Sequence, residues 1–415
     1  MSKKIVVIGG GIIGLCTAYY LHKGGHEVIV VDKSKMNEGA SYVNAGYITP
    51  SHIIPLSAPG MITKGLKWML NPASPFYIKP RLDKEFLKWG WAFKKSATKS
   101  KMEQAIPVIK DINLLSRELY EEMKSTSDFT FHYERNGLLM LCKSEKALEE
   151  EWQVGNRAIS EGLNVTRLTK SETQQYEPEI DLDIAGSVYF DCDAHMTPSE
   201  FMGGMKDYLK KEGVTFYIQE EVKDINFSEA IISGVITSKR TITCDEVVLA
   251  AGSWSPMLVQ KLGLSIPIQA GKGYRINVNR PTGIRTPAVL VESKVAVTPM
   301  NGFTRFAGTM EIGGINHRIN PVRVDAIAQS ASKYYSGLTI TPQEKQSAAC
   351  GLRPCTPDGL PYIGRSSKCN NLTVATGHAM MGWSLGPATG KLISEIIDSK
   401  KVSLDLTPFN PDRRF

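Results

Sequence analysis

The sequence predicts an α/β fold built from two domains. The chain has 415 residues, a length that corresponds to two or three ordinary domains. Apolar runs at residues 5–8 and 27–31 lie on either side of a helical pattern at residues 12–23. A further apolar run at residues 246–251 again ends in small residues. Buried strands that alternate with helices in this way are typical of a parallel sheet with helices on its faces.

The turn after the first strand carries the pattern Gly9-x-Gly11-x-x-Gly14. Gly9 makes the tight turn, Gly11 lets backbone N–H groups approach a pyrophosphate, and Gly14 allows the helix to pack closely on the strand. The N-terminus of the helix, at Ile12 and Ile13, adds a partial positive charge. We therefore predict a dinucleotide site at this turn.

Asp32 ends the second predicted strand and is followed by Lys33. It stands 18 residues after Gly14, and a carboxylate at this distance accepts hydrogen bonds from a ribose 2′-OH. Asp32 therefore supports the prediction of a dinucleotide.

Two later strands indicate which dinucleotide is bound. They lie at residues 246–251 and 372–376, and after Gly382 a helix is predicted to run to about residue 398. The free N–H groups at the start of that helix would face an electron-rich atom, such as the C2 carbonyl of a flavin. A second nucleotide-type strand so far along the chain is not expected of a simple NAD dehydrogenase. We therefore predict FAD.

Composition excludes several classes of protein. The apolar run at residues 5–8 is too short for a signal peptide, and no stretch is apolar enough to span a membrane. Seven cysteines without a C-x-x-C pair indicate a reduced, cytoplasmic protein without structural zinc. The net charge is +7, but no repeat mixes aromatic and basic residues as nucleic-acid-binding modules do. We expect no nucleic-acid partner.

Motifs spread over the whole chain resemble the D-amino-acid oxidase superfamily of flavoproteins. They are the glycine turn at residues 9–14, the Ala-Gly-Ser-Trp-Ser segment at 251–255 and the segment Gly-Leu-Arg-Pro-Cys-Thr-Pro-Asp-Gly-Leu-Pro-Tyr-Ile-Gly at 351–364. Within the superfamily the chain is most similar to bacterial FAD-dependent D-amino-acid dehydrogenases, with glycine oxidases next. Residues 41–46, residues 377–383 and the repeated Lys-Trp between residues 67 and 89 favour the dehydrogenases.

The resemblance implies an FAD-binding domain and a substrate domain. The Rossmann-like FAD-binding domain, of the glutathione-reductase type, would comprise residues 1–80, 150–258 and 345–415, and the mixed, mostly antiparallel α+β substrate domain residues 81–149 and 259–344. The local patterns agree with this division. Strand-like composition is found at residues 134–142, 214–218 and 288–297, and helical spacing at residues 107–124 and 145–162.

The resemblance also implies the residues that hold FAD. Besides the residues of the first turn and second strand, they are Ser41, Asn44, Ala45, Gly46, Val222, Ala251, Gly252, Trp254, Gly351, His378, Gly382, Trp383 and Ser384. The ring of His378 either contacts the flavin or packs in the core. Cys350 lies one position away from where sarcosine oxidases attach their flavin, so we expect non-covalent FAD, with a covalent bond as the alternative.

Arg353 is the first candidate for binding the substrate. A guanidinium holds a carboxylate with two parallel hydrogen bonds and so fixes its orientation. In the family the arginine of the Gly-x-Arg-Pro segment has this role, and Arg353 occupies that position. Tyr47, His52 and Tyr274 are further candidates, each of which either lines the pocket or packs in the core. Met380 stands where glycine oxidases carry an arginine, a difference that weakens the glycine-oxidase reading.

The implied reaction is oxidative deamination of a D-amino acid, with hydride transfer from Cα to flavin N5 and electrons passed to a quinone or similar acceptor. We expect no protein nucleophile, no acid–base residue and no metal, because the cofactor supplies the chemistry and the protein orients the substrate. The alternatives are a D-proline or hydroxyproline dehydrogenase, an oxidase that uses oxygen, and a flavin-binding scaffold subunit.

Most of the net positive charge is in one segment. Residues 62–101 carry ten Lys and Arg against two Asp and Glu, and three of the six tryptophans. Such a segment suits peripheral contact with the inner, anionic face of a membrane, where a quinone would be the acceptor. The alternative is a solvated helix face whose tryptophans are buried in the fold.

Overall fold

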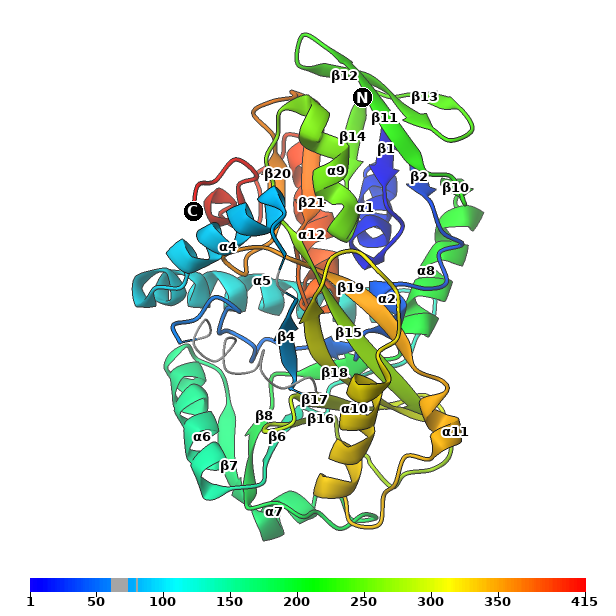
Figure 1. Ribbon diagram of the computed structural model, residues 1–415. Coiled ribbons are helices and arrows are strands. Elements are labelled where there is room, and N and C mark those ends of the chain that lie inside the picture. Colours follow the sequence, from blue (N-terminus) through cyan, green and yellow to red (C-terminus); the bar gives the residue numbers. More distant parts are fainter. Residues whose placement is uncertain (61–73, 80) are drawn as a thin grey trace.

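A computed structural model describes residues 1–60, 74–79 and 81–415. The predicted basic segment 62–101 therefore lies partly outside the described residues. In Figure 1 a sheet with surrounding helices forms the upper part of the molecule, and a second sheet forms the lower part. The α/β fold predicted from the sequence, with its second mixed domain, is confirmed.

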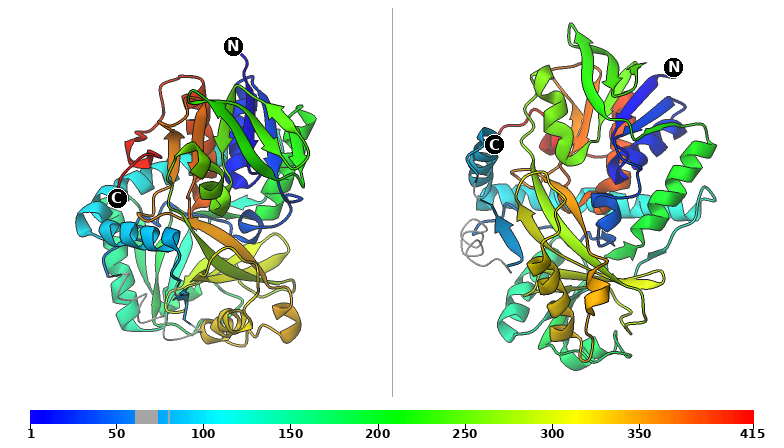
Figure 2. Two further views of the ribbon diagram at one scale, coloured as in Figure 1. Left: turned by 45° about the horizontal axis from the view of Figure 1, so that its top comes forward. Right: turned by 45° about the vertical axis from the view of Figure 1, so that its right-hand side comes forward.

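The upper sheet contains six strands among the described residues. Their order is β10 (Thr215–Ile218), β2 (Glu27–Asp32), β1 (Lys4–Ile8), β14 (Glu246–Leu249), β21 (Leu372–Thr376) and β20 (Tyr362–Arg365). All neighbours run parallel except β20 and β21. Figure 2 shows that blue, green and orange strands, which lie far apart in the sequence, are side by side in this sheet.

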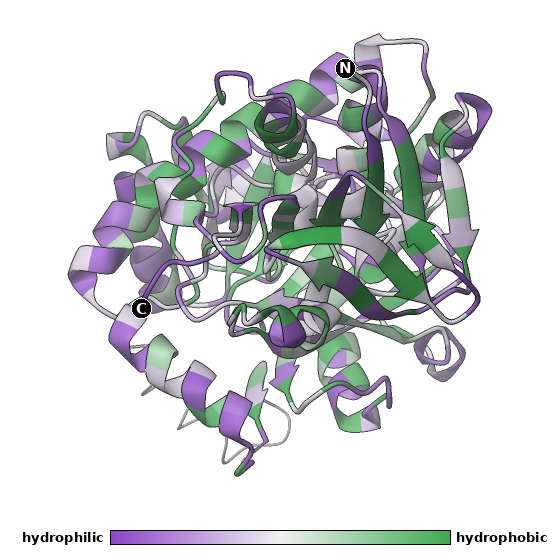
Figure 3. Ribbon diagram, turned by 90° about the horizontal axis from the view of Figure 1, so that it is seen from above, coloured by the Kyte–Doolittle hydropathy of each residue, from purple (hydrophilic) through white to green (hydrophobic). Residues whose placement is uncertain are grey.

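Both faces of the upper sheet are buried. Successive residues of a strand point to opposite faces of the sheet, so each strand contributes apolar side chains to both faces. On one face Val7 and Val30 pack with helices α1 (Ile12–Lys23), α5 (Lys99–Ser125), α8 (Pro198–Lys211) and α12 (Gly382–Ile397). On the other face Val6 and Ile29 pack with α9 (Ser255–Val259) and with a small sheet of β11 (Val222–Ser228), β12 (Ile231–Thr237) and β13 (Thr241–Thr243). Coloured by hydropathy, the strands are largely green, and the outer helices alternate purple and green (Figure 3).

The lower sheet contains nine strands among the described residues and is mostly antiparallel. Its order is β19 (Ala349–Cys355), β15 (Gln269–Val278), β18 (Phe303–Ile312), β17 (Val295–Met300), β16 (Ala288–Leu290), β6 (Leu138–Cys142), β8 (Gly186–Phe190) and β7 (Val165–Thr169), with β4 (Phe76–Ile78) beside β18. Helix α10 (Pro321–Tyr334) packs on β15 and β18, and α6 (Glu145–Ser160) packs on β6, β7 and β8.

Smaller elements lie around the two large sheets. A three-stranded sheet has the order β3 (Tyr47–Ile48), β9 (Ala194–Met196) and β5 (Tyr133–Glu134). Among the described residues the other α-helices are α2 (Ala40–Val43), α4 (Lys84–Ser96), α7 (Lys170–Gln174) and α11 (Pro342–Lys345). In the part of the chain that the structure describes, no helix combines the length and the apolar character needed to span a membrane.

Several elements lie outside the part that the predicted domain division gave them. Strands β4, β7, β8 and β19 lie within residues 1–80, 150–258 and 345–415, which were assigned to the FAD-binding domain, but they pair in the lower sheet. Helix α5 lies within residues 81–149, which were assigned to the substrate domain, but it packs on α12 beside the upper sheet. Hydrogen bonding between strands and helix packing connect segments that a linear division separates.

Candidate active site

One cavity of about 990 Å³ lies between the two sheets. Its walls come from the β1–α1 turn, the end of β14, strand β19 and the start of α12. The volume is at the upper end of the range for ligand pockets. It therefore has room for a large cofactor together with a small substrate.

The glycine turn shapes one end of the cavity. Gly9 has a φ of +107°, and a Cβ there would lie 2.5 Å from the carbonyl oxygen of Ala250. A Cβ at Gly14 would lie 1.8 Å from the carbonyl oxygen of Gly9. Gly14 does not line the cavity, so it acts by letting α1 approach β1, as the sequence predicted.

The N-terminus of α1 faces the cavity without a side-chain cap. Its N-cap residue is Gly11, and the first turn contains no acidic residue. The N–H of Ile12 donates to Ser41 Oγ at 3.0 Å, and Ile13 follows it on the cavity wall. A helix start of this kind binds an anionic group such as a phosphate.

Asp32 lies at the same end of the cavity. Its carboxylate accepts hydrogen bonds from the N–H of Gly10 at 2.8 Å and from the N–H and hydroxyl of Ser34, each at 2.7 Å. A carboxylate offers about four acceptor positions, so one remains for a ribose hydroxyl. Close by, Lys33 Nζ lies 3.5 Å from the ring centroid of Trp254, a cation–π contact between two predicted cofactor residues.

The N-terminus of α12 faces the same cavity and also lacks a side-chain cap. Trp383 Nε1 donates to the carbonyl of Ser41 at 2.8 Å, which ties α12 to α2. Ser384 Oγ accepts from the N–H of Thr49 at 3.0 Å. The free N–H groups of this first turn are positioned for an electron-rich ligand atom.

The ring of His378 is hydrogen-bonded to another side chain of the protein. Nε2 is hydrogen-bonded to Thr389 Oγ1 in α12 at 3.0 Å, and burial lowers the pKa of the ring to about 3. His378 is therefore neutral. Of the two roles left open by the sequence, this contact favours packing of the ring within the protein.

Arg353 projects from β19 into the cavity. Among the described residues its guanidinium makes one hydrogen bond, from Nη1 to the carbonyl oxygen of Thr309 at 2.8 Å. It forms no ion pair with a carboxylate there, and burial lowers its pKa. A cation that is shielded from bulk water and lacks a counter-ion favours an anionic ligand.

Thr309 was not predicted from the sequence. It lies on the cavity wall with a φ of +62°, and its buried Oγ1 has no hydrogen-bond partner among the described residues. A buried hydroxyl without a partner is costly unless a ligand or water satisfies it. No sequence motif marks this residue, because its position follows from the backbone conformation of β18.

His52 lines the cavity and is the end of a hydrogen-bonded chain. Nδ1 lies 3.1 Å from Ser51 Oγ, which also donates to the buried carboxyl group of Asp193. Burial, reinforced by the charge of Lys294, lowers the pKa of His52 to about 4. The ring is therefore neutral near pH 7, and Nε2 makes no hydrogen bond within the described ranges.

Tyr47 and Tyr274 line the cavity, but their hydroxyl groups are engaged elsewhere. The Tyr47 hydroxyl lies 2.7 Å from the carbonyl oxygen of Ala288 and 2.9 Å from that of Val297. Tyr274 donates to Glu311 at 2.9 Å. Both tyrosines can therefore shape the pocket with their rings without offering a free hydroxyl group.

The structure brings the predicted residues together from five regions of the chain. On the cavity wall lie Gly9, Gly11, Ile12, Ile13, Asp32, Lys33, Ser41, Asn44, Ala45, Tyr47, His52, Val222, Ala251, Gly252, Trp254, Tyr274, Gly351, Arg353, His378, Gly382, Trp383 and Ser384. Gly14 and Gly46 do not line it. A Cβ at Gly46 would lie 2.2 Å from the carbonyl oxygen of Met196, so this glycine permits a close approach of two backbones.

These features fit FAD. A single cavity is lined by two helix N-termini whose N-cap residues offer no side-chain hydrogen bond, by the glycine turn and by the Asp32 carboxylate with its spare acceptor position. The half-buried cation Arg353 lines the same cavity. The arrangement provides one region for a dinucleotide and another for a small anionic substrate.

Comparison with known proteins agrees with this arrangement. The sequence profile of the DAO family, described as FAD dependent oxidoreductase, matches residues 4–396. A D-amino acid dehydrogenase of Helicobacter pylori is 32% identical over 400 residues, covering 95% of each chain. One from Cereibacter sphaeroides is 30% identical over 424 residues, covering 99% of this chain and 97% of the relative.

Solved structures share the fold. Glycine oxidase from Geobacillus kaustophilus superposes with a TM-score of 0.79 at 23% identity, covering 100% of this chain and 99% of the other. L-proline dehydrogenase from P. horikoshii superposes with a TM-score of 0.73 at 18% identity, covering 99% and 97%. The chain belongs to the DAO family of FAD-dependent oxidoreductases.

Proposed function

We propose that this protein is an FAD-dependent D-amino-acid dehydrogenase that converts D-amino acids to 2-oxo acids and ammonia. The observation that carries the proposal is Arg353, a cation on the cavity wall without a counter-ion among the described residues. An α-amino acid supplies the missing carboxylate. The names of the curated relatives support the D configuration of the substrate.

The chain's own residues bind and orient the substrate. Arg353 holds the carboxylate through the donors that do not bond to Thr309, and the Thr309 hydroxyl is available to the same group. Bound FAD supplies the acceptor for a hydride from the substrate Cα. The imino acid that leaves the protein is hydrolysed in water.

His52 provides a hydrogen-bond acceptor for the substrate amine. An amino acid carries an ammonium group near pH 7, and hydride transfer requires the neutral amine. Burial and the charge of Lys294 lower the pKa of His52 to about 4, so the ring stays neutral and does not hold the proton that the ammonium group loses, which passes to water. Its Nε2 can accept a hydrogen bond from the amine, while Ser51 and Asp193 hold the ring through Nδ1. The proposal therefore keeps the expectation that no acid–base residue takes part.

Apolar side chains make up much of the cavity wall beyond Arg353, among them Met140, Val289, Ala296 and Met310. Lys294 also lines the cavity, and its charge acts on His52. The pocket therefore supports D-amino acids with hydrocarbon side chains, and Lys294 offers a cation to an acidic side chain as well.

The test is anaerobic reduction of the purified yellow protein. D-Alanine, D-phenylalanine and other D-amino acids are expected to bleach the flavin absorbance, and their L-enantiomers are not. The Arg353→Met variant with bound flavin is the control, because it keeps the cofactor and loses the carboxylate contact. Retention of colour with every D-amino acid and cyclic imino acid tried would refute the proposal.

A second candidate is an oxidase resembling glycine oxidase, or a dehydrogenase of D-proline or hydroxyproline. Glycine oxidase and L-proline dehydrogenase share the fold of this chain, which is why these two activities are the second candidate. Oxygen uptake during turnover would identify an oxidase, whereas reduction of a soluble quinone without oxygen uptake would identify a dehydrogenase. Comparing D-proline with D-alanine as reductant separates the cyclic from the primary amine substrates.

We also propose that the protein is cytoplasmic and docks on the anionic inner face of the membrane, where a quinone accepts the electrons. The support is α4, on which Trp91 and Leu87 are 60% and 55% exposed. Lys94 and Lys95 lie 5.8 and 5.6 Å from the Trp91 ring. Trp89, by contrast, is buried and donates to the carbonyl oxygen of Cys355. One tryptophan of α4 therefore belongs to the core and the other to the surface.

Vesicle binding tests the docking. The double variant Lys94→Glu/Lys95→Glu is expected to bind vesicles of anionic phospholipid much more weakly than the unmodified protein. Lys146→Glu/Lys170→Glu, on exposed positions of α6 and α7, is the matched charge control and is expected to bind as the unmodified protein does. If the unmodified protein ignores anionic vesicles, the docking proposal is wrong and the flavin chemistry is unaffected.

A further inference from the structure

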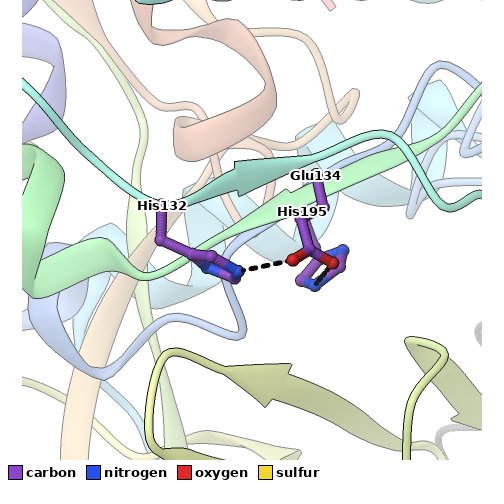
Figure 4. A group of neighbouring side chains, drawn as sticks. All are labelled: His132, Glu134 and His195. Atoms are coloured by element: carbon purple, nitrogen blue, oxygen red, sulfur yellow. Dashed lines mark hydrogen bonds and ion pairs between the residues drawn. The ribbon is translucent and has the colours of Figure 1, made fainter.

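Two histidines and a glutamate face one another on strands β5 and β9, outside the cavity that holds the predicted site. His132 and Glu134 are two residues apart in an extended segment, so their side chains point to the same side. The strand register pairs Glu134 with His195 directly. Figure 4 shows the three side chains converging, with Glu134 between the two rings.

The distances match a shared metal ion. His132 Nε2 lies 3.2 Å from one carboxylate oxygen of Glu134, and His195 Nε2 lies 3.7 Å from the other. One ligand atom from each residue lies within 4.8 Å of those of the other two. Ligands at about 2.0–2.1 Å around a tetrahedral zinc ion are themselves about 3.4 Å apart. The cluster therefore needs only small side-chain movements to coordinate an ion.

His195 provides an independent observation. Its side chain is 0% exposed, and neither ring nitrogen has a hydrogen-bond partner in the described part of the chain. Leaving a buried ring unsatisfied is costly, and a metal ion would satisfy one nitrogen.

His132 is already held as metal-binding histidines are. Its Nδ1 is hydrogen-bonded to Thr197 Oγ1 at 2.9 Å, and that oxygen also accepts from the N–H of Asn301 at 2.9 Å. A hydrogen bond at one ring nitrogen orients the other toward the metal. Nε2 of His132 is the nitrogen that faces Glu134.

We propose that His132, Glu134 and His195 bind one zinc-class divalent transition-metal ion. Two imidazoles and a carboxylate suit zinc and its neighbours rather than calcium or magnesium. Three protein ligands leave a fourth position for water. The Glu134 side chain is 46% exposed, so the ion enters from solvent.

The position of the cluster indicates a structural role. His195 of β9 pairs with Glu134 on one side and with Tyr47 of β3 on the other. Tyr47 lines the cavity, whereas the three ligands do not. The metal would therefore join β5 to β9. It would also stabilise the position of β3, which pairs with β9 and carries Tyr47 of the cavity wall.

The experiment uses flavin-loaded protein that has been dialysed against EDTA and then against buffer. Zinc binding is measured by equilibrium dialysis with metal analysis, and thermal unfolding is recorded with and without zinc. We expect one high-affinity zinc ion per chain and a higher unfolding temperature with zinc. Glu134→Gln and His132→Asn are expected to lower the affinity at least about 100-fold and to abolish the thermal shift.

Matched controls are Glu150→Gln and His22→Asn, which change an exposed glutamate and a histidine that pairs with Glu212. Both controls are expected to bind zinc as the unmodified protein does. Equal flavin content in all variants shows that they are folded. The proposal is overturned if the unmodified protein binds no zinc at micromolar concentration, or if Glu134→Gln and its control bind zinc equally well.

Discussion

The half-buried Arg353 differs from the buried cations of the lower sheet. Lys272 and Arg323 share the carboxylate of Glu311, at 3.3 and 3.4 Å. Arg305 has no carboxylate, but its guanidinium donates to three oxygens, those of Tyr42, Asn44 and Asn277. Arg353 has a single acceptor among the described residues. Its remaining donors are therefore available to a ligand, which is why one arginine of several is assigned to the substrate.

Replacing Arg353 by Lys removes the paired hydrogen bonds and keeps the charge. The KM for D-amino acids is expected to rise about 10- to 100-fold, since a hydrogen bond to a charged group contributes about 1.5–3 kcal/mol. Flavin content is expected to stay unchanged. Steady-state kinetics check this, with Arg285→Lys, at an exposed arginine paired with Glu179, as the control. Unchanged kinetic parameters would remove Arg353 from the site.

His52→Phe tests the proposed contact with the substrate amine. Phe keeps a flat ring but offers no hydrogen-bond acceptor. We expect the KM to rise about 10-fold, since one hydrogen bond contributes about 0.5–1.5 kcal/mol, and the pH dependence of kcat to stay unchanged, because His52 remains neutral over the working range. Steady-state kinetics with D-alanine at a series of pH values check this. A change in the shape of the pH profile would show instead that His52 takes up the proton.

The glycine turn, Asp32 and Arg353 were predictable from the sequence because each belongs to a short motif with a local physical reason. Thr309 and Asp193 were not. Thr309 depends on a positive φ in β18, and Asp193 meets Ser51 across 142 residues of chain. The His132-x-Glu134 spacing is a strand signal, and it has meaning only once β9 is known to lie beside it. Contacts between side chains that are far apart in the chain cannot be predicted from the pattern of a single sequence.

At the scale of elements, Glu246 ties the upper sheet together. This residue of β14 accepts a hydrogen bond from Lys3 Nζ at 2.9 Å and is paired through both oxygens with Arg365 of β20. The paired cations hold the pKa of Glu246 below its usual range, against the effect of burial. One carboxylate thus joins the start of the chain to a strand more than 350 residues later.

Glu246→Gln is expected to lower the free energy of unfolding by roughly 1–3 kcal/mol at pH 7. Because the folded pKa is depressed, the ionised group contributes stability above the ordinary pKa of a glutamate, about 4.3, and this contribution is lost as the pH falls through the folded pKa. The difference in unfolding free energy between the two proteins should therefore shrink as the pH falls. Urea unfolding at a series of pH values from 7 downward checks this, with the exposed Glu27→Gln as control. A difference that stays constant over the series would contradict the argument.

Element boundaries were predictable where a turn-forming residue, such as glycine, stands at the end of a helix or strand. Helix α12 begins at Gly382, one residue before the predicted start at Trp383, because the glycine turn before it breaks the strand pattern. Residues 288–297 were expected to be one strand-like stretch, but they form β16 and β17 with a turn between them. That turn contains Lys294 at a φ of +52° and no glycine or proline. Because this turn lacks the usual turn-forming residues, the sequence pattern does not predict that the chain reverses direction here.

At the scale of the whole molecule, the cofactor is expected to be held by non-covalent contacts only. The Cys350 thiol lines the cavity and donates to the carbonyl oxygen of His317 at 3.5 Å, and burial raises its pKa. A thiol with a raised pKa is a poor nucleophile near pH 7. Denaturation followed by ultrafiltration should release all the flavin, from both the unmodified protein and Cys350→Ala. Flavin that stays with the polypeptide would show a covalent bond.

The overall architecture was predictable from motifs, whereas the division into domains was not fully so. Strands β7 and β8 have the same local composition whichever sheet they join. Only the pairing of β8 with β6, and of β7 with β8, places them in the lower part. Helix α5 is likewise assigned by the face it covers on α12. Local patterns predict what an element is, and the contacts between distant segments decide where it belongs.

The strand order of the upper sheet has a consequence for biosynthesis. β1 gains its neighbour β14 only after some 240 further residues, and β14 gains β21 only after some 120 more. Pairing between such distant segments is slow and leaves strand edges exposed in the meantime. On the ribosome, β1 and β2 therefore emerge together, long before β14 and β21. The upper sheet can be completed only once β21 (Leu372–Thr376) has been synthesised, although the nucleotide-binding turn is among the first segments to emerge.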